Sequence, residues 1–263
     1  MIEDRLALIK QKGFMPELKF GQNFLCDEDI IRDIVDLGGI GKEDMVLEIG
    51  PGLGSISVPI TELTDSLTVV EIDKRLATFL QEEMELKANI ISSDFLKLKD
   101  YGADKFDVVV SNLPYYVMTD IMKKLLGECT HARKMVFMVE EDALPRLFAE
   151  KGSKQYGPLA VLCALYGELR KEFTVPRGSF IPSPNTTSCV ISLTKGDNEL
   201  SDGIVKFINR AFAMRRKKLV NNIKEAAGVL DKLGLPSDVR AEQLEPVKFI
   251  ELYNAIIGNS EPA

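Results

Sequence analysis

The stretch Asn112-Leu113-Pro114-Tyr115-Tyr116 follows an apolar run and carries residue types suited to chemistry on an aromatic amine. The exocyclic amine of a nucleobase is a poor nucleophile because its lone pair is delocalised into the ring. The side-chain oxygen of Asn112 and the carbonyl of Leu113 could accept the hydrogens of such an amine, while Pro114 removes a competing backbone donor. Tyr115 offers a face for an extruded base, and such stacking contributes about 1–3 kcal/mol. Alone, the stretch fits a proline turn that ends a strand beside a half-buried tyrosine better than it fits a reaction centre.

A glycine-rich turn, Glu48 to Gly54, follows another apolar run. In an open α/β sheet, such a turn lies at the carboxyl end of the first strand, where ligands bind. Ser55 replaces the third glycine of the dinucleotide-binding pattern, which disfavours a nicotinamide oxidoreductase. Glu71 could accept hydrogen bonds from ribose hydroxyls, and Asp94 could accept one from an adenine amine beside the ring of Phe95. Together these positions predict a nucleoside pocket.

The elements that must position these residues alternate along the chain. Apolar runs bounded by turn residues predict strands, and apolar residues at helical spacing predict helices. Strands are predicted over 45–49, 67–72, 89–92, 106–111 and 133–139, and helices over 29–37, 57–63, 74–86 and 118–126. This alternation predicts an α/β fold with a mostly parallel sheet and crossover helices.

The later part of the chain has a different pattern. Strands are predicted over 173–175 and 189–193, a helix or buried segment over 158–169, and helices over 204–212, 219–230 and 246–257. Because the two strands bracket a proline-rich loop at 176–184, we expect the last strands to run antiparallel to the rest. A polar break at 195–198 predicts a boundary between a catalytic domain with an N-terminal extension, 1–196, and a small helical C-terminal domain, 197–263.

The charge balance argues against a nucleic-acid binder, because such proteins are normally basic. Among 263 residues, 33 are Lys or Arg and 40 are Asp or Glu, giving a net charge of -7. However, the segment Arg210 to Lys218 holds five cations and no acid. Phosphate contacts come from such local clusters, so the segment predicts a basic nucleic-acid contact surface.

Metal and disulfide chemistry are not predicted. Cys26, Cys129, Cys163 and Cys189 lie far apart, and His131 is the only histidine. Isolated cysteines usually behave as small buried hydrophobes, and a lone imidazole has no metal-binding partner. The sequence also lacks a signal-peptide pattern and an apolar run long enough for a membrane span, so we expect a cytoplasmic protein with no membrane partner.

Six motifs in order resemble those of the ribosomal RNA adenine N6,N6-dimethyltransferases, over nearly the whole chain. They are Lys19 to Leu25, Glu48 to Gly54, Asn112 to Tyr116, Phe180 to Pro184, Arg215 to Lys217 and Arg240 to Leu244. The sequence looks closer to the KsgA-like small-subunit enzymes than to the Erm resistance methylases. The last two motifs favour the small-subunit type.

The resemblance implies a Rossmann-like class I methyltransferase fold and S-adenosylmethionine as methyl donor, with S-adenosylhomocysteine as product and no metal. It implies N6-dimethylation of two adjacent adenosines in the 3′-terminal hairpin of small-subunit rRNA within an assembling ribosomal subunit. The residues implied to bind the cofactor are Asn23, Phe24, Leu25, Gly50, Gly52, Glu71, Asp94 and Asn112. Those implied to act on the target base are Asn112, Leu113, Pro114, Tyr115 and Phe180, with Tyr115 and Phe180 enclosing the adenine. Those implied to bind RNA are Arg215, Arg216, Lys217 and Lys218.

The chain departs from the expected pattern at three places. Glu140-Glu141-Asp142 replaces a stretch of the Gln-Lys-Glu type, Pro145 lies in an expected helix, and Thr186 occupies a usually apolar position. Two other hypotheses therefore stay open beside the favoured one. They are an Erm-like large-subunit rRNA methylase that confers antibiotic resistance, and a ribosome-assembly factor that binds RNA without catalysis. We expect a monomer in each case.

Overall fold

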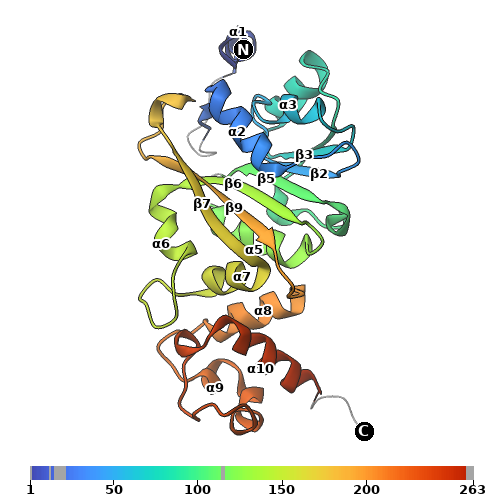
Figure 1. Ribbon diagram of the computed structural model, residues 1–263. Coiled ribbons are helices and arrows are strands. Elements are labelled where there is room, and N and C mark those ends of the chain that lie inside the picture. The colour runs from blue at the N-terminus through green and yellow to red at the C-terminus, as the bar shows by residue number, and fades with distance from the viewer. Residues whose placement is uncertain (1, 12, 15–21, 114–115, 259–263) are drawn as a thin grey trace.

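The computed structural model describes residues 2–11, 13–14, 22–113 and 116–258. Helix α1 (Ile2–Gln11) lies at one end of the molecule, and the C-terminal helices lie at the other, with a twisted sheet between them (Figure 1).

Within the described residues, the main sheet has seven strands in the order β4-β3-β2-β5-β6-β9-β7. These strands are β2 (Val46–Ile49), β3 (Leu67–Glu71), β4 (Asn89–Ser92), β5 (Val108–Asn112), β6 (Lys134–Glu140), β7 (Gly167–Val175) and β9 (Ser188–Lys195). Neighbours from β4 to β6 pair in parallel, whereas β9 is antiparallel to both β6 and β7. The predicted parallel sheet with antiparallel pairing near its end is therefore confirmed.

Both faces of the sheet are covered, which explains why its central strands are continuously apolar. On β5, Val108 and Val110 contribute to one core, and Val109 contributes to the core on the opposite face. The helices of the first core are α2 (Glu28–Gly38) and α3 (Ser57–Thr61), and those of the second are α5 (Met118–Glu128) and α7 (Pro158–Tyr166).

Three of the predicted elements have other boundaries than expected. The apolar helix expected over 158–169 ends at Tyr166, and β7 begins at Gly167, well before the predicted strand at 173–175. The residues from Glu168 to Glu172 are mostly charged because β7 is the edge strand of the sheet, where charged side chains are common. The helix expected over 74–86 is α4 (Lys74–Thr78) followed by a π-helical turn, Phe79–Glu83.

The C-terminal part consists of α8 (Asp202–Ala211), α9 (Leu219–Asn222), short 3-10 turns and α10 (Pro246–Gly258). The single helix predicted over 219–230 was wrong, because α9 ends at Asn222 and a 3-10 turn follows over Lys224–Gly228. Its residues nevertheless supply core positions, including Ile223 and Ala226.

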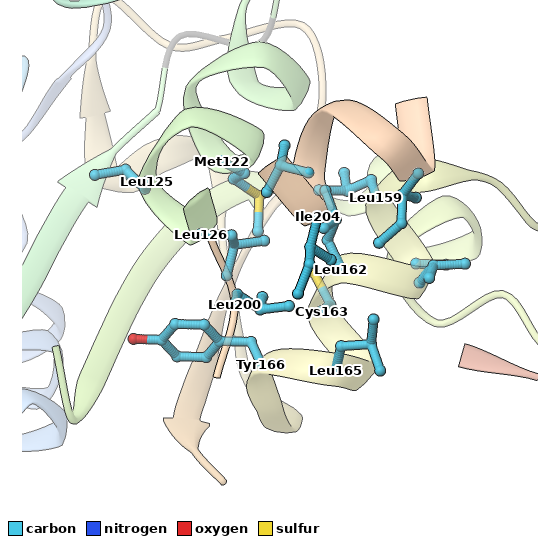
Figure 2. Packing of buried hydrophobic residues seen from close by; sticks show 14 of the residues in the cluster. Met122, Leu125, Leu126, Leu159, Leu162, Cys163, Leu165, Tyr166, Leu200 and Ile204 are labelled. Carbon is cyan, nitrogen blue, oxygen red and sulfur yellow. The ribbon is translucent and has the colours of Figure 1, made fainter. Parts of the chain in front are cut away.

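A single hydrophobic cluster crosses the boundary predicted after residue 196. Figure 2 shows Met122 and Leu126 of α5, Leu162 of α7 and Ile204 of α8 packed together. Gly127 permits this close packing, since a Cβ there would lie 2.8 Å from a methyl carbon of Val205. The C-terminal helices therefore pack directly against α5 and α7 of the sheet-containing part.

Candidate active site and nucleic-acid surface

The glycine-rich turn after β2 forms the floor of a cleft at the carboxyl end of the sheet. Gly50, Gly52 and Gly54 have positive φ values of 70°, 58° and 75°, a backbone region that favours glycine. A Cβ on Gly52 would lie only 3.2 Å from the ring of Phe24. The turn therefore lets the backbone, instead of side chains, face the cleft.

Glu71 is the last residue of β3, and its side chain links the glycine-rich turn after β2 to the residues that follow β3. Its carboxylate accepts hydrogen bonds from the amide of Gly52 at 3.1 Å and from the amide of Asp73 at 2.8 Å. The side chain is buried, and this burial raises the pKa of Glu71 to about 7. Each carboxylate oxygen keeps a further lone pair, which suits a pair of ribose hydroxyls.

A second buried carboxylate, Glu48, also lines the cleft, although we did not predict it as a site residue. The Ser57 hydroxyl donates to it at 2.5 Å, and burial raises the pKa of Glu48 to about 8. A sequence signal for this residue was present, because an acid within an apolar β-strand is unusual.

The cleft brings together most of the residues predicted to bind a cofactor. Of these, Asn23, Phe24, Leu25, Gly50, Gly52, Glu71 and Asn112 line it, as does Leu113 from the predicted catalytic set. Lining residues that the prediction missed are Gln22, Glu48, Pro51, Ser55, Ile56, Ile72 and Leu76. Gln22, Ile72 and Leu76 were missed because their place in the cleft depends on contacts between distant parts of the chain, whereas Glu48, Pro51, Ser55 and Ile56 lie in or next to the predicted glycine turn.

Asp94 is not among the residues lining this cleft. Its carboxylate caps a 3-10 turn, accepting from the Leu96 amide at 3.0 Å, and lies 3.4 Å from the Lys97 ammonium. The side chain is 30% exposed, so a ligand can still reach it. Tyr116 extends near both Asp94 and Glu71, and burial together with these acids raises the pKa of its hydroxyl.

Asn112 ends β5, so its side chain reaches the same edge of the sheet as Glu71. Its amide nitrogen donates to the Asn23 carbonyl at 3.5 Å, across the cleft wall. The next residue, Leu113, is buried, and its amide donates to the Met138 carbonyl at 3.1 Å. Pro114 and Tyr115, both predicted to be catalytic, lie outside the described residues.

Phe180 is the predicted site residue whose position differs most from expectation. Strand β8 (Phe180–Ile181) pairs with β1 (Phe24–Leu25) in a small antiparallel sheet, where Leu25 lies opposite Phe180. The Phe180 ring is 3% exposed and packs within the hydrophobic core. In this conformation the ring supports the cleft wall and does not present a face to a base.

The basic segment divides into two kinds of residue. Arg216, Lys217 and Lys218 are exposed, and they line a groove of the C-terminal part together with Arg240. Arg215 instead has its guanidinium engaged by protein groups, donating from Nε to Glu242 Oε2 at 2.6 Å and from Nη2 to the Ser153 carbonyl at 2.7 Å.

A second basic groove lies between α5 and the C-terminal part. It is lined by four cations and no acid: Lys123, Arg146, Lys154 and Arg215. Thr119, near the start of α5, lies at the same groove, only a few residues after Asn112 and Leu113. Arg215, which directly precedes the exposed Arg216 in sequence, also lines this groove.

Two of the departures in sequence, Thr186 and Glu140, contact each other. The Thr186 hydroxyl donates to Glu140 at 2.6 Å, and the Lys171 ammonium pairs with Glu141 at 2.8 Å. Pro145 lies in the first turn of α6 (Leu144–Leu147), where a helix does not need its amide hydrogen. Glu140 and Glu141 are therefore engaged within the protein, and the proline does not break a helix.

The structure also bears on metal binding, on the state of the cysteines and on membrane insertion. The described part of the chain contains no group of three or more His, Cys, Asp or Glu residues placed to hold a metal ion. His131 is exposed, and all four cysteines are free thiols. Among the described helices, none has both the length and the apolar character needed to cross a membrane.

The sheet order, the glycine turn after β2 and the acid at the end of β3 define a class I methyltransferase fold. The chain belongs to the ribosomal RNA adenine dimethylase family, whose sequence profile matches residues 14–257. Membership of this methyltransferase family implies S-adenosylmethionine as the methyl donor.

Relatives named ribosomal RNA small subunit methyltransferase A are similar over nearly their whole length. The protein of Magnetococcus marinus is 36% identical over 270 residues, which cover 97% of this chain and 97% of the relative. That of Geobacillus thermodenitrificans is 35% identical, with 95% of this chain and 94% of the relative covered.

Two solved structures share the fold. A dimethyladenosine transferase from Plasmodium falciparum superposes with a TM-score of 0.72 at 21% identity, covering 90% of this chain and 98% of that chain. The 23S rRNA methyltransferase ErmE superposes with a TM-score of 0.58 at 21% identity, covering 89% and 100%.

Proposed function

We propose that this protein transfers methyl groups from S-adenosylmethionine to N6 of two adjacent adenosines in the 3′-terminal hairpin of small-subunit rRNA, during ribosome assembly. The observation that carries the proposal is the convergence of Gly50, Glu71 and Asn112 on one cleft, in a chain of the adenine dimethylase family. The names of the full-length relatives support the small subunit as the target.

The residues of the cleft fit an adenosyl cofactor. The glycine turn offers backbone that can approach a ligand closely, and a buried carboxylate at the end of β3 suits a ribose. We assign the ribose to Glu71, the adenine amine to Asp94 and the amino-acid portion to the wall formed by Asn23, Phe24, Leu25 and the turn at Gly50 and Gly52. When bound, the cofactor supplies an electrophilic methyl group on a sulfonium, and S-adenosylhomocysteine remains after transfer.

Asn112 and Leu113 act on the target base in this proposal. The amide nitrogen of Asn112 faces Asn23, so its side-chain oxygen is the atom available to accept a hydrogen from the adenine amine. The Leu113 carbonyl accepts a second hydrogen bond from the amine, and both bonds orient the nitrogen lone pair toward the methyl group. After transfer, the methylated nitrogen releases one proton to solvent, and the sulfur keeps the electron pair of the broken bond. Catalysis is then mainly positioning for in-line transfer, which needs neither a metal nor a covalent intermediate.

We assign stacking on the base to Tyr115, beside Pro114. Phe180 was predicted to cover the opposite face of the adenine, and that role requires its ring to leave the core. Its burial supports another role, which is to hold Leu25 and β1 against the cofactor cleft through the pairing of β1 with β8.

Phosphates of the RNA are proposed to contact Arg216, Lys217 and Lys218 and the groove at Lys123, Arg146 and Lys154. These cations are local exceptions on an acidic protein, and phosphate contacts fix the register of a nucleic acid without reading its sequence. We further propose that the protein works as a monomer in the cytoplasm, the compartment in which bacterial ribosomal subunits assemble.

The test is methyl transfer from labelled S-adenosylmethionine to small subunits, free small-subunit rRNA and large-subunit rRNA from cells that lack these modifications. Nucleoside analysis should find N6,N6-dimethyladenosine in the small subunit alone. Label confined to large-subunit rRNA would support an Erm-like enzyme instead. No transfer to any RNA, with the cofactor still bound in calorimetry, would support a non-catalytic assembly factor.

A further inference from the structure

The loop between α6 and α7 is attached to the C-terminal part at several points. The amide of Gly152 donates to the Glu242 carbonyl at 2.8 Å, and the Tyr156 hydroxyl donates to the Leu244 carbonyl at 2.8 Å. An ion pair joins Lys151 to Glu245. We call residues 151–157 the docking loop.

Arg215 contributes three of the hydrogen bonds that attach this loop or its partner. Its Nε donates to Glu242 Oε2 at 2.6 Å, its Nη2 to the Ser153 carbonyl at 2.7 Å, and its Nη1 to the Lys154 carbonyl. One guanidinium therefore ties a carboxylate of the C-terminal part to two carbonyls of the docking loop. A planar guanidinium is suited to such a fixed set of acceptors, which the single ammonium of a lysine cannot reproduce.

The neighbours of Arg215 are arranged differently. In the part of the chain that the structure describes, Arg216, Lys217 and Lys218 are exposed and form no ion pair with a carboxylate. The side chain of Arg215 is 34% exposed, and that of Glu242 is 24% exposed. Arg215 therefore uses its donors and its charge within the protein, whereas Arg216 keeps both for an external anion.

The docking loop also forms one side of the basic groove. Lys154 and Tyr156 line the groove opposite Thr119 and Lys123 of α5. Any displacement of the docking loop would change the width and shape of this groove.

We propose that Arg215 is a positioning residue. Joined to Glu242, it fixes the docking loop against the C-terminal part and so sets the path of the RNA from the cleft to Arg216, without binding a phosphate itself. This inference rests on the proposed function for its RNA, but the loop attachment is a property of the free protein.

Glu242→Gln separates this role from direct phosphate binding, because the two roles predict opposite effects. If Arg215 positions the loop, Glu242→Gln and Arg215→Ala should both lower kcat/KM for the RNA about tenfold. In Arg215→Ala the kcat at saturating RNA, the affinity for S-adenosylmethionine and the salt dependence of RNA binding should stay unchanged. Glu242→Gln also releases Arg240, whose guanidinium lies 4.0 Å from the same carboxylate, so its salt dependence is compared with that of Arg240→Ala combined with Glu242→Gln. If Arg215 binds a phosphate, Glu242→Gln would free its charge and leave RNA affinity equal or higher, and the proposal would be overturned.

Arg215→Lys and Arg216→Ala are the matched controls. Arg215→Lys keeps the charge but not the three-way attachment, so it should behave like Arg215→Ala; full activity would overturn the proposal. Arg216→Ala should reduce the slope of log affinity against log salt by about 0.7–0.9, as expected when one phosphate is no longer neutralised by the protein.

Amide hydrogen exchange without RNA tests the attachment independently of the substrate. Exchange at Gly152 and in the docking loop should rise at least tenfold in Arg215→Ala and Glu242→Gln, while exchange in β5 and β6 stays unchanged. An unchanged rate at Gly152 would overturn the proposal. Faster exchange in the docking loop together with no methylation of any RNA would leave the attachment established and refute the proposed function instead.

Discussion

The amide nitrogen of Asn112 lies 3.5 Å from the carbonyl oxygen of Asn23, so the end of β5 is joined to a residue 89 positions earlier in the chain. This hydrogen bond brings the residue proposed to hold the target amine next to the wall proposed to hold the cofactor. It also orients the Asn112 side chain, because its nitrogen faces Asn23 and its oxygen faces away.

Asn112→Ala should lose methyl transfer by about 100-fold to 1,000-fold, the range found when one oriented hydrogen-bonding group is removed from a reacting centre. Binding of S-adenosylmethionine should be weaker but measurable, since Glu71 and the glycine turn remain. Transfer is measured with labelled cofactor, and binding is measured by calorimetry. Asn254→Ala, on the exposed face of α10, is the control, and full activity of Asn112→Ala would remove the assigned role.

Cofactor affinity should depend on pH through Glu71. Because burial raises the pKa of Glu71 to about 7, the carboxyl is largely protonated in the free protein below that pH. Only the ionised form can accept from two ribose hydroxyls, so affinity should fall as pH is lowered from about 8 to 6, and binding at pH 7 should release protons. Calorimetry in buffers of different ionisation enthalpy measures that release. Glu71→Gln should bind more weakly with a flatter pH profile; an equally steep profile would assign the titration to another group.

Glu48→Gln should change the pH dependence of stability. Burial raises the pKa of Glu48 to about 8 in the folded protein, above its ordinary value near 4.5. A group with a raised pKa contributes stability that is present below about pH 4.5 and is lost as pH rises through about 8. Glu48→Gln has no such loss and keeps an acceptor for Ser57. Its melting temperature relative to the wild type should therefore rise between pH 5 and 9, and a constant difference would argue against a proton on Glu48.

Arg5 should support cofactor binding from outside the cleft. Its Nη1 donates to the carbonyls of Leu53 at 3.2 Å and Gly54 at 3.0 Å, holding the glycine turn against α1. Arg5→Ala should weaken S-adenosylmethionine binding about tenfold, roughly 1.4 kcal/mol, with kcat at saturation retained. Arg32→Ala, which removes an exposed pair with Asp29, serves as the control. Equal affinities of both variants would show that the turn holds its shape without Arg5.

The basic groove between α5 and the C-terminal part should contribute to RNA affinity in proportion to the number of its cations that contact phosphates. Lys123→Ala and Arg146→Ala together should weaken binding and lower the salt slope by about 0.7–0.9 for each phosphate that the protein no longer neutralises. The effect should be similar for RNAs of different sequence, since phosphate contacts carry no base information. Filter binding at several salt concentrations measures it, with Lys232→Ala, on an exposed 3-10 turn, as control. An unchanged slope would place the RNA elsewhere.

The strand ends that form the cleft could be predicted because their signals are local. The glycine turn after Ile49, the acid at Glu71 and the polar residue at Asn112 each follow an apolar run, and parallel strands bring such ends together. The contribution of Arg5 could not be predicted in this way, and Glu48 was overlooked although an acid within an apolar strand is a local signal. Their partners, Leu53 and Ser57, are recognised only once the chain is folded and its distant segments are in contact.

The errors in the fold have similar physical causes. Strand β7 was mostly missed because its residues from Glu168 to Glu172 lie at a sheet edge and lack the apolar alternation of a strand covered on one face. The segment after Leu219 was predicted as one helix because its apolar spacing suits a helix. Short turns can bury the same residues, including Ile223 and Ala226. Likewise, the basic character of Arg215 was visible in sequence, but its partner Glu242 was not.

The hydrophobic cluster shared by α5, α7, α8 and α10 makes the two parts of the chain one cooperative unit. Leu126 of α5 and Leu162 of α7 belong to the same buried cluster as the C-terminal helices, so unfolding of the sheet should expose part of the core of those helices. Heating should therefore give a single calorimetric transition whose van't Hoff and calorimetric enthalpies agree. A fragment cut after Lys195 would expose apolar surface on both pieces, so the RNA-binding part would not be separable by truncation.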